Sequence, residues 1–145
     1  MKKVGLIGGG RMGEALARGL ILSKFLPSEA VGVCDVDLRR LDHLHQEFGV
    51  ATFKSNVLLA QWADVVVLAV KPQIVSEVLR ELGGGKLDGK LIVSIVAGLP
   101  LETIKAGLAP SARAVRVMPN TPAQVLEGMS VICFDGSIGD AEHLF

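Results

Sequence analysis

Residues 4–13, VGLIGGGRMG, lie near the start of the chain and carry the clearest indication of its fold. An apolar run at residues 4–7 is followed at once by a turn with the pattern G-x-G-x-x-G. From Met12 to Leu20, apolar and small residues recur at i, i+3, i+4, i+7 and i+8, which predicts an amphipathic helix. A strand, a glycine turn and a helix in this order form the phosphate-binding unit of a doubly wound α/β sheet.

The glycine turn itself predicts nucleotide binding. Gly8 permits the tight turn, Gly10 lets the backbone approach a pyrophosphate, and Gly13 lets the helix pack closely on the strand. The start of the helix adds free N–H groups and the positive end of its dipole. A purely structural turn is the alternative interpretation.

The same alternation of strand and helix continues along the whole chain. Further apolar runs typical of strands lie at residues 31–34, 50–53, 65–70, 91–96, 114–118 and 129–134. Segments of helical period lie between them, from about Asp37, from about Pro72, and over residues 101–109. This pattern predicts a Rossmann-like, doubly wound, mostly parallel sheet with helices on both faces, as one NAD(P)-binding domain over residues 1–145.

Composition excludes several classes of partner. Fifteen Lys and Arg balance fifteen Asp and Glu, so the basic surface that nucleic acid requires is not expected. No apolar run approaches the roughly 20 residues of a membrane span, and nothing near the start directs export, so we expect a cytoplasmic protein.

The two cysteines, Cys34 and Cys133, lie in apolar runs and are expected to be buried, reduced thiols. His43 and His45 do not share a helix face, and no metal site is expected.

The position of Asp35 bears on the choice of dinucleotide. It closes the second predicted strand, roughly 20 residues after Gly13, where a carboxylate that binds ribose hydroxyls belongs. An aspartate that merely starts a helix is the alternative. Arg39 and Arg40 follow within one turn and could pair with a 2′-phosphate, although they could equally be solvated. The preference between NADP and NAD therefore stays open.

Unusual residues gather at the carboxyl ends of three predicted strands. They are the segments 69–73 (AVKPQ), 97–98 (AG) and 119–122 (PNTP). The carboxyl ends of parallel strands lie along one edge of a doubly wound sheet, and ligands bind in the crevice there. Ser-His-Asp sets, Cys-His pairs and paired carboxylates are missing from this edge, so we expect no catalytic residue in this segment and a cofactor that supplies the chemistry.

Five segments of the chain resemble one enzyme family. They are residues 5–12 (GLIGGGRM), 68–73 (LAVKPQ), 92–98 (IVSIVAG), 116–122 (RVMPNTP) and 127–128 (EG). In order and spacing they are similar to the N-terminal half of pyrroline-5-carboxylate reductase. The resemblance implies hydride transfer from NADPH or NADH to the C=N carbon of 1-pyrroline-5-carboxylate, which gives L-proline in the last step of proline biosynthesis.

The same resemblance implies a set of cofactor contacts. Residues 8–12 would hold the pyrophosphate, Asp35 and Asn56 would lie toward the adenosine, and the others would line the path to the nicotinamide. The full set is Ile7, Gly8, Gly10, Arg11, Met12, Asp35, Asn56, Ala69, Val70, Lys71, Pro72, Val96, Ala97 and Asn120.

The family also has a second half, an all-helical domain that forms a homo-oligomer and supplies the substrate pocket. We expect this domain to be absent from the chain and residues 140–145 to open a helix, a frayed tail being the alternative. Two other functions stay open. One is an NAD(P) oxidoreductase similar to β-hydroxyacid dehydrogenases, and the other is a non-catalytic module that senses NAD(P).

Overall fold

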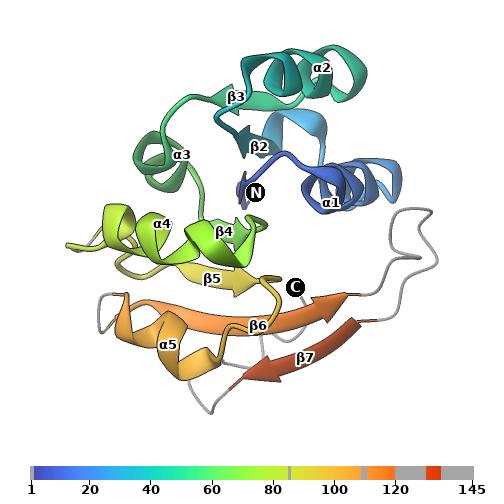
Figure 1. Cartoon of the computed structure of the whole chain (residues 1–145). Coiled ribbons are helices and arrows are strands. Elements are labelled where there is room, and N and C mark those ends of the chain that lie inside the picture. The colour runs from blue at the N-terminus through green and yellow to red at the C-terminus, as the bar shows by residue number, and fades with distance from the viewer. Residues whose placement is uncertain (1, 85, 109–110, 120–129, 135–145) are drawn as a thin grey trace.

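The structure is a computed structural model that describes residues 2–84, 86–108, 111–119 and 130–134. Its strands are β1 (Val4–Ile7), β2 (Val31–Cys34), β3 (Ala51–Phe53), β4 (Val65–Leu68), β5 (Leu91–Ser94), β6 (Arg113–Pro119) and β7 (Ser130–Phe134). They form one sheet in the order β3-β2-β1-β4-β5-β6-β7, which Figure 1 shows from one side. Neighbouring strands are parallel except β6 and β7, which are antiparallel. The predicted Rossmann-like, mostly parallel sheet is confirmed.

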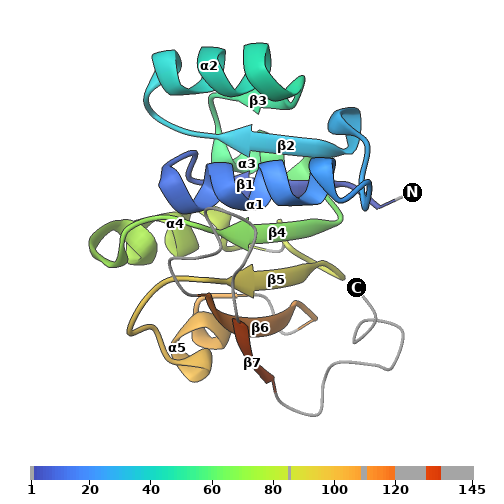
Figure 2. The same cartoon turned by 90° about the vertical axis from the view of Figure 1, so that its right-hand side faces the viewer.

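Helices lie on both faces of this sheet, as predicted. They are α1 (Arg11–Leu22), α2 (Leu38–Phe48), α3 (Asn56–Trp62), α4 (Val75–Leu82) and α5 (Leu101–Ala106), with short 3-10 turns η1 (Ser28–Ala30) and η2 (Pro72–Ile74). Helices α1 and α2 cover one face, and α3, α4 and α5 cover the other (Figures 1 and 2). One apolar cluster lies under each set, so β1, β2 and β4 are buried on both faces.

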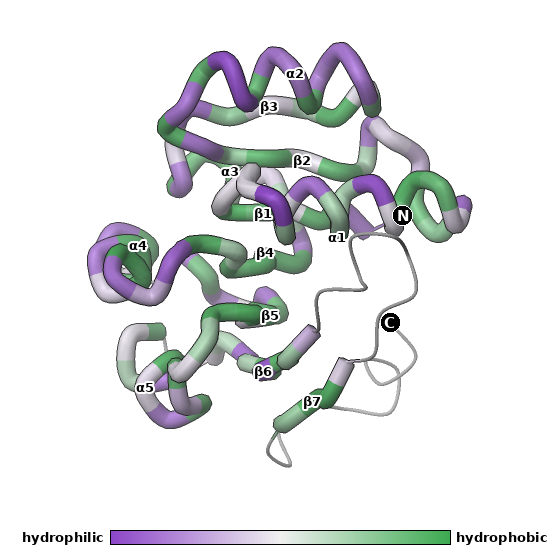
Figure 3. The backbone as a smooth tube through the Cα atoms, turned by 45° about the vertical axis from the view of Figure 1, so that its right-hand side comes forward, coloured by the Kyte–Doolittle hydropathy of each residue, from purple (hydrophilic) through white to green (hydrophobic). Residues whose placement is uncertain are grey.

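The face that carries α1 is covered unevenly. Among the described elements, no helix lies in front of β5, β6 and β7 on this face, and Figure 3 shows apolar segments there. The result is an apolar groove of about 500 Å³, lined by side chains that include Leu16 of α1, Val93 of β5 and Phe134 of β7. We call this groove the open sheet face. Among the described elements, this half of the sheet therefore has helices on one face only.

Several boundaries differ from those predicted. The apolar runs at residues 65–70 and 91–96 continue past their strands, because the β4–β5 ladder ends at Leu68 and Ser94. The helix expected over residues 101–109 ends at Ala106, and Gly107 follows it as the C-cap. Helix α3 was not predicted at all. It has 7 residues and begins after Ser55, whose hydroxyl accepts a hydrogen bond from the Leu58 N–H.

The cysteine prediction is half right. Both cysteines are free thiols, and Cys34 is buried at the end of β2. Cys133 is exposed, because every residue of β7 is exposed in this structure. The helix expected at residues 140–145 and the site residue Asn120 lie outside the described residues. Within the described part of the chain, the helices are all too short or too polar to cross a membrane, the longest being α1 with 12 residues.

Candidate nucleotide-binding site

The glycine turn between β1 and α1 is built around three glycines with different surroundings. Gly8 has φ +108°, and a Cβ there would lie 2.5 Å from the carbonyl oxygen of Ala69. A Cβ on Gly13 would lie 2.0 Å from the carbonyl oxygen of Gly8. A Cβ on Gly10 would meet nothing within 4 Å. Gly8 and Gly13 are therefore required by the protein itself, whereas Gly10 borders open space.

This open space lies at the start of α1. Gly10 is the N-cap residue and provides no side-chain hydrogen bond to the first turn. The first N–H groups of a helix have no partner within the helix, so those of α1 are available to an anion. Arg11, exposed at the first helical position, adds positive charge beside them. The residues present therefore fit a pyrophosphate.

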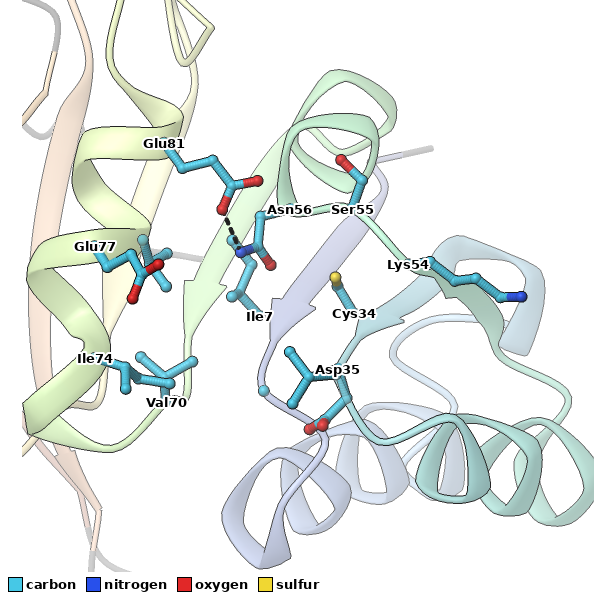
Figure 4. A pocket seen from close by; sticks show the side chains of 13 residues that line it. Ile7, Cys34, Asp35, Lys54, Ser55, Asn56, Val70, Ile74, Glu77 and Glu81 are labelled. Atoms are coloured by element: carbon cyan, nitrogen blue, oxygen red, sulfur yellow. Dashed lines mark hydrogen bonds between the residues drawn. The ribbon is translucent and has the colours of Figure 1, made fainter.

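A cleft of about 470 Å³ adjoins the turn at the carboxyl ends of β1 and β2. Figure 4 shows the side chains of β1, β2, the start of α3 and α4 that point into it. It is lined by Ile7, Gly8, Cys34, Asp35, Val36, Lys54, Ser55, Asn56, Val70, Ile74, Glu77, Val78 and Glu81. The cleft is thus apolar at its floor, with carboxylate and amide groups around it.

The structure brings many of the predicted cofactor residues together. Those that line the cleft are Ile7, Gly8, Asp35, Asn56 and Val70. Those in the adjoining turn and first turn of α1 are Gly10, Arg11 and Met12. The segment that follows β4 carries Ala69, Lys71 and Pro72, and Ala69 lies against Gly8. Val96 and Ala97 follow β5 and do not line this cleft.

Other lining residues were missed by the prediction. Ile74, Val78 and Glu81 come from η2 and one face of α4, at the i, i+4, i+7 spacing. The helical period was visible in the sequence, but it could not show that this face turns toward β1 and β2. Val36, which follows Asp35, has a fully exposed side chain at the cleft.

Asn56 and Glu81 connect two helices across the cleft. The side-chain amide of Asn56, at the start of α3, donates from Nδ2 to Oε2 of Glu81 on α4 at 2.9 Å (Figure 4). The amide oxygen of Asn56 and the other oxygen of Glu81 can each accept further hydrogen bonds. This end of the cleft therefore provides acceptors for hydroxyl or amino hydrogens of a ligand.

Asp35 supports the glycine turn directly. Its Oδ2 accepts a hydrogen bond from the Gly9 N–H at 2.7 Å, and its Oδ1 accepts one from the Asp37 N–H at 2.9 Å. The N-cap of α2 is Asp37, which accepts from the Arg39 N–H at 3.0 Å. The helix-starting aspartate considered as an alternative for Asp35 is thus Asp37, and Asp35 itself lines the cleft.

The two neighbouring arginines have different surroundings. Arg39 is 95% exposed and lies 3.8 Å from the Asp37 carboxylate. Arg40 forms an ion pair with Glu14 of α1, and its Nε donates to the Gly9 carbonyl oxygen at 2.5 Å. The exposed Arg39 side chain can therefore extend toward a ligand, whereas Arg40 is bound to the turn.

Burial dominates the chemistry of Cys34. Desolvation by burial, together with the smaller effects of the Glu81 and Asp35 carboxylates, raises the pKa of its thiol to about 11. Cys34 is therefore a neutral thiol near pH 7. It packs in the floor of the cleft and is not a nucleophile there.

The raised pKa of Cys34 predicts a pH-dependent stability. In the unfolded chain the thiol ionises near pH 9, so its contribution is complete below pH 9 and is lost as the pH rises toward 11. Between pH 8 and pH 10.5 the parent should lose on the order of 2 kcal/mol more unfolding free energy than Cys34→Ala, measured by urea denaturation. Cys133→Ala, at an exposed position, is the matched control and should follow the parent. Parallel curves for the parent and Cys34→Ala would contradict the prediction.

One family matches most of this fold. Residues 3–98 match the family described as "NADP oxidoreductase coenzyme F420-dependent". A pyrroline-5-carboxylate reductase from Methanosarcina acetivorans is 40% identical over 131 residues, which are 90% of this chain and 48% of that protein. The chain thus spans about half the length of the curated relatives it matches.

Solved structures agree with these sequence relatives. A pyrroline-5-carboxylate reductase from Coxiella burnetii superposes with a TM-score of 0.92 at 32% identity, over 99% of this chain and 53% of that one. The pyrroline carboxylate reductase of Plasmodium falciparum, solved with NADP bound, has a TM-score of 0.86 at 29% identity, over 99% and 52% of the two chains. The described fold is therefore that of the first half of these proteins.

Proposed function

The chain belongs to the family of NADP oxidoreductases described as coenzyme F420-dependent, and from this premise we propose that it is the dinucleotide-binding part of a pyrroline-5-carboxylate reductase. The proposed reaction is reduction of the C=N bond of 1-pyrroline-5-carboxylate to L-proline, with NADPH or NADH as reductant. A cytoplasmic location is part of the same proposal. The similarity to curated reductases over 90% of the chain supports the choice of substrate.

The open space beside Gly10 is the observation that carries the proposal. It combines a backbone without a side chain, the N-terminus of α1 and the exposed Arg11. A dinucleotide pyrophosphate has the charge and the acceptors that such a site binds. Residues 8–12 would hold it there.

The adjoining cleft suits the adenosine end. Val36, which follows β2, and Ile74 of η2 both expose apolar side chains in the cleft. A flat base would pack between them. Asp35 and Asn56 would lie toward the ribose. Their oxygens accept hydrogen bonds from hydroxyl groups, which fits the proposed contact.

The nicotinamide would lie along the edge formed by the ends of β4 and β5. We propose that Ala69, Val70, Lys71, Pro72, Val96, Ala97 and Asn120 line its path. When bound, the cofactor supplies the hydride, and these residues would orient the ring and exclude water. The family resemblance and the common sheet edge support this assignment, and Asn120 lies outside the described residues.

The open sheet face supports a proposal about the rest of the enzyme. It is apolar, about 500 Å³ in volume, and includes the exposed β7 side chains of Ile132 and Phe134. An uncovered apolar surface of this kind favours an interaction site. We propose that it packs against a helical second half like the one implied for the longer relatives, which would supply the substrate pocket and form the homo-oligomer.

Binding and turnover together test the function. Residues 1–145 should bind NADPH in calorimetry yet oxidise it negligibly with 1-pyrroline-5-carboxylate, because hydride transfer needs the two carbons held about 3–3.5 Å apart. A chain that includes the second half should form proline. Oxidation of a β-hydroxyacid by that chain, or no binding of any dinucleotide, would overturn the proposal. Full imine reduction by residues 1–145 would place the substrate pocket within them.

The opposed charges near the ribose predict weak selectivity between the two dinucleotides. Asp35 would repel a 2′-phosphate, and the exposed Arg39 would attract it. At such positions each effect is about 1 kcal/mol, so NADPH and NADH should bind within about tenfold of each other. The measurement is the Kd of each by fluorescence titration. A hundredfold preference in either direction would contradict it.

A further inference from the structure

The peptide bond between Gly9 and Gly10, in the turn before α1, is held by an arginine of α2. The Nε of Arg40, on α2, donates to the Gly9 carbonyl oxygen at 2.5 Å. On the other side of the same residue, the Gly9 N–H donates to Asp35 at 2.7 Å. Gly9 is buried, and a Cβ there would come within 3.0 Å of Leu44. Both polar backbone atoms of Gly9 are thus held before any ligand binds.

This contact sets the direction of the next N–H group. A trans peptide is planar, so the Gly10 N–H points opposite to the Gly9 carbonyl. Because Arg40 holds the carbonyl, the Gly10 N–H points away from Arg40. Gly10 is the residue that borders the open space at the start of α1. Its N–H is therefore a preoriented donor in the turn.

Arg40 also neutralises a charge near the same place. Its guanidinium forms an ion pair with Glu14, which lies in the first turn of α1, and the two side chains are 28% and 25% exposed. An unpaired carboxylate in this turn would repel an incoming phosphate. A single side chain thus orients the donor and removes the opposing charge.

We propose that Arg40 is a positioning residue for the dinucleotide pyrophosphate and does not itself bind the 2′-phosphate. The inference rests on the proposed function. It separates Arg40 from its neighbour Arg39, which is 95% exposed and makes no contact with the glycine turn among the described interactions. Arg39 is therefore the matched control on the same helix turn.

The test compares the Kd of NADPH and of NADH for the parent, Arg40→Met and Arg39→Met. Loss of a charged hydrogen bond and an ion pair should weaken both dinucleotides about tenfold in Arg40→Met, with their ratio unchanged. Arg39→Met should weaken NADPH alone. Equal binding by Arg40→Met and the parent, or a loss confined to NADPH, would overturn the proposal.

A second variant separates this role from general destabilisation. Adding Glu14→Gln to Arg40→Met removes the carboxylate that Arg40 no longer neutralises and should restore about threefold of the lost affinity for both dinucleotides. A double variant that binds no better than Arg40→Met would overturn the charge-neutralising part. If Arg40→Met does not fold, Arg40→Lys replaces it, because a lysine keeps the ion pair but not the Nε contact.

A measurement without ligand separates this inference from the proposed function. The ¹⁵N order parameter of the Gly10 amide should fall in Arg40→Met and remain at the parent value in Arg39→Met. An unchanged order parameter in Arg40→Met would overturn the inference even if dinucleotides bind. If the parent binds no dinucleotide, the proposed function fails, and a lower order parameter still supports the hold of Arg40 on the turn.

Discussion

Gly10→Val should abolish dinucleotide binding and leave the fold intact. A side chain at residue 10 meets no protein atom within 4 Å, and the Gly10 backbone has φ −67° and ψ −169°, which other residues adopt. The valine would instead fill the space assigned to the pyrophosphate. We expect the Kd of NADPH to rise at least about hundredfold, which is about 3 kcal/mol, with the melting temperature unchanged.

Gly10→Ala is the graded control for this experiment. Its single methyl group fills less of the same space, so the loss of affinity should be smaller than for Gly10→Val. Calorimetry gives both affinities, and thermal unfolding checks the fold. A Gly10→Val protein that binds NADPH as tightly as the parent would show that the pyrophosphate site lies elsewhere.

The first two strands could be predicted to the residue because the residue after each one marks its carboxyl end. Residues 4–7 and 31–34 are the predicted and observed bounds of β1 and β2. Glycine at position 8 and aspartate at position 35 interrupt the apolar runs there. The runs that begin at Val65 and Leu91 have no such interruption, so the end of each ladder is set by pairing between β4 and β5.

Helix α3 is an element whose local sequence pattern is too weak to predict it. Its 7 residues span about two turns, too short for a clear amphipathic period. The visible signal was Ser55, a favoured N-cap residue, followed by an apolar run. The helix forms because Leu59 and Ala60 are fully buried in the sheet core. Tertiary packing thus stabilises a segment whose own pattern is ambiguous.

The backbone of the candidate site could be predicted from the sequence, whereas the contacts of its side chains could not. The glycine pattern identified the turn, because the positive φ of Gly8 and the close approach of Gly13 to Gly8 are set within a few residues. The contacts of Asp35 with Gly9 and of Arg40 with Glu14 each join residues 26 apart in the sequence. Such partners depend on how α1, α2 and β2 pack, so charge and spacing alone left Arg39 and Arg40 equivalent. The structure distinguishes them.

Gly13→Ala should strongly reduce the stability of the fold, whereas Gly10→Val should reduce dinucleotide binding and leave the stability unchanged. A Cβ on Gly13 would overlap the Gly8 carbonyl oxygen at 2.0 Å, and the only relief is to move α1 away from β1. Overpacking of this kind against backbone costs about 3 kcal/mol or more, which lowers the melting temperature of a domain this size by about 10 °C. Gly10→Ala adds the same methyl group three residues earlier and should melt with the parent, as thermal unfolding by circular dichroism would show. If Gly13→Ala and Gly10→Ala have the same melting temperature, the close approach of α1 to β1 does not require a glycine at position 13.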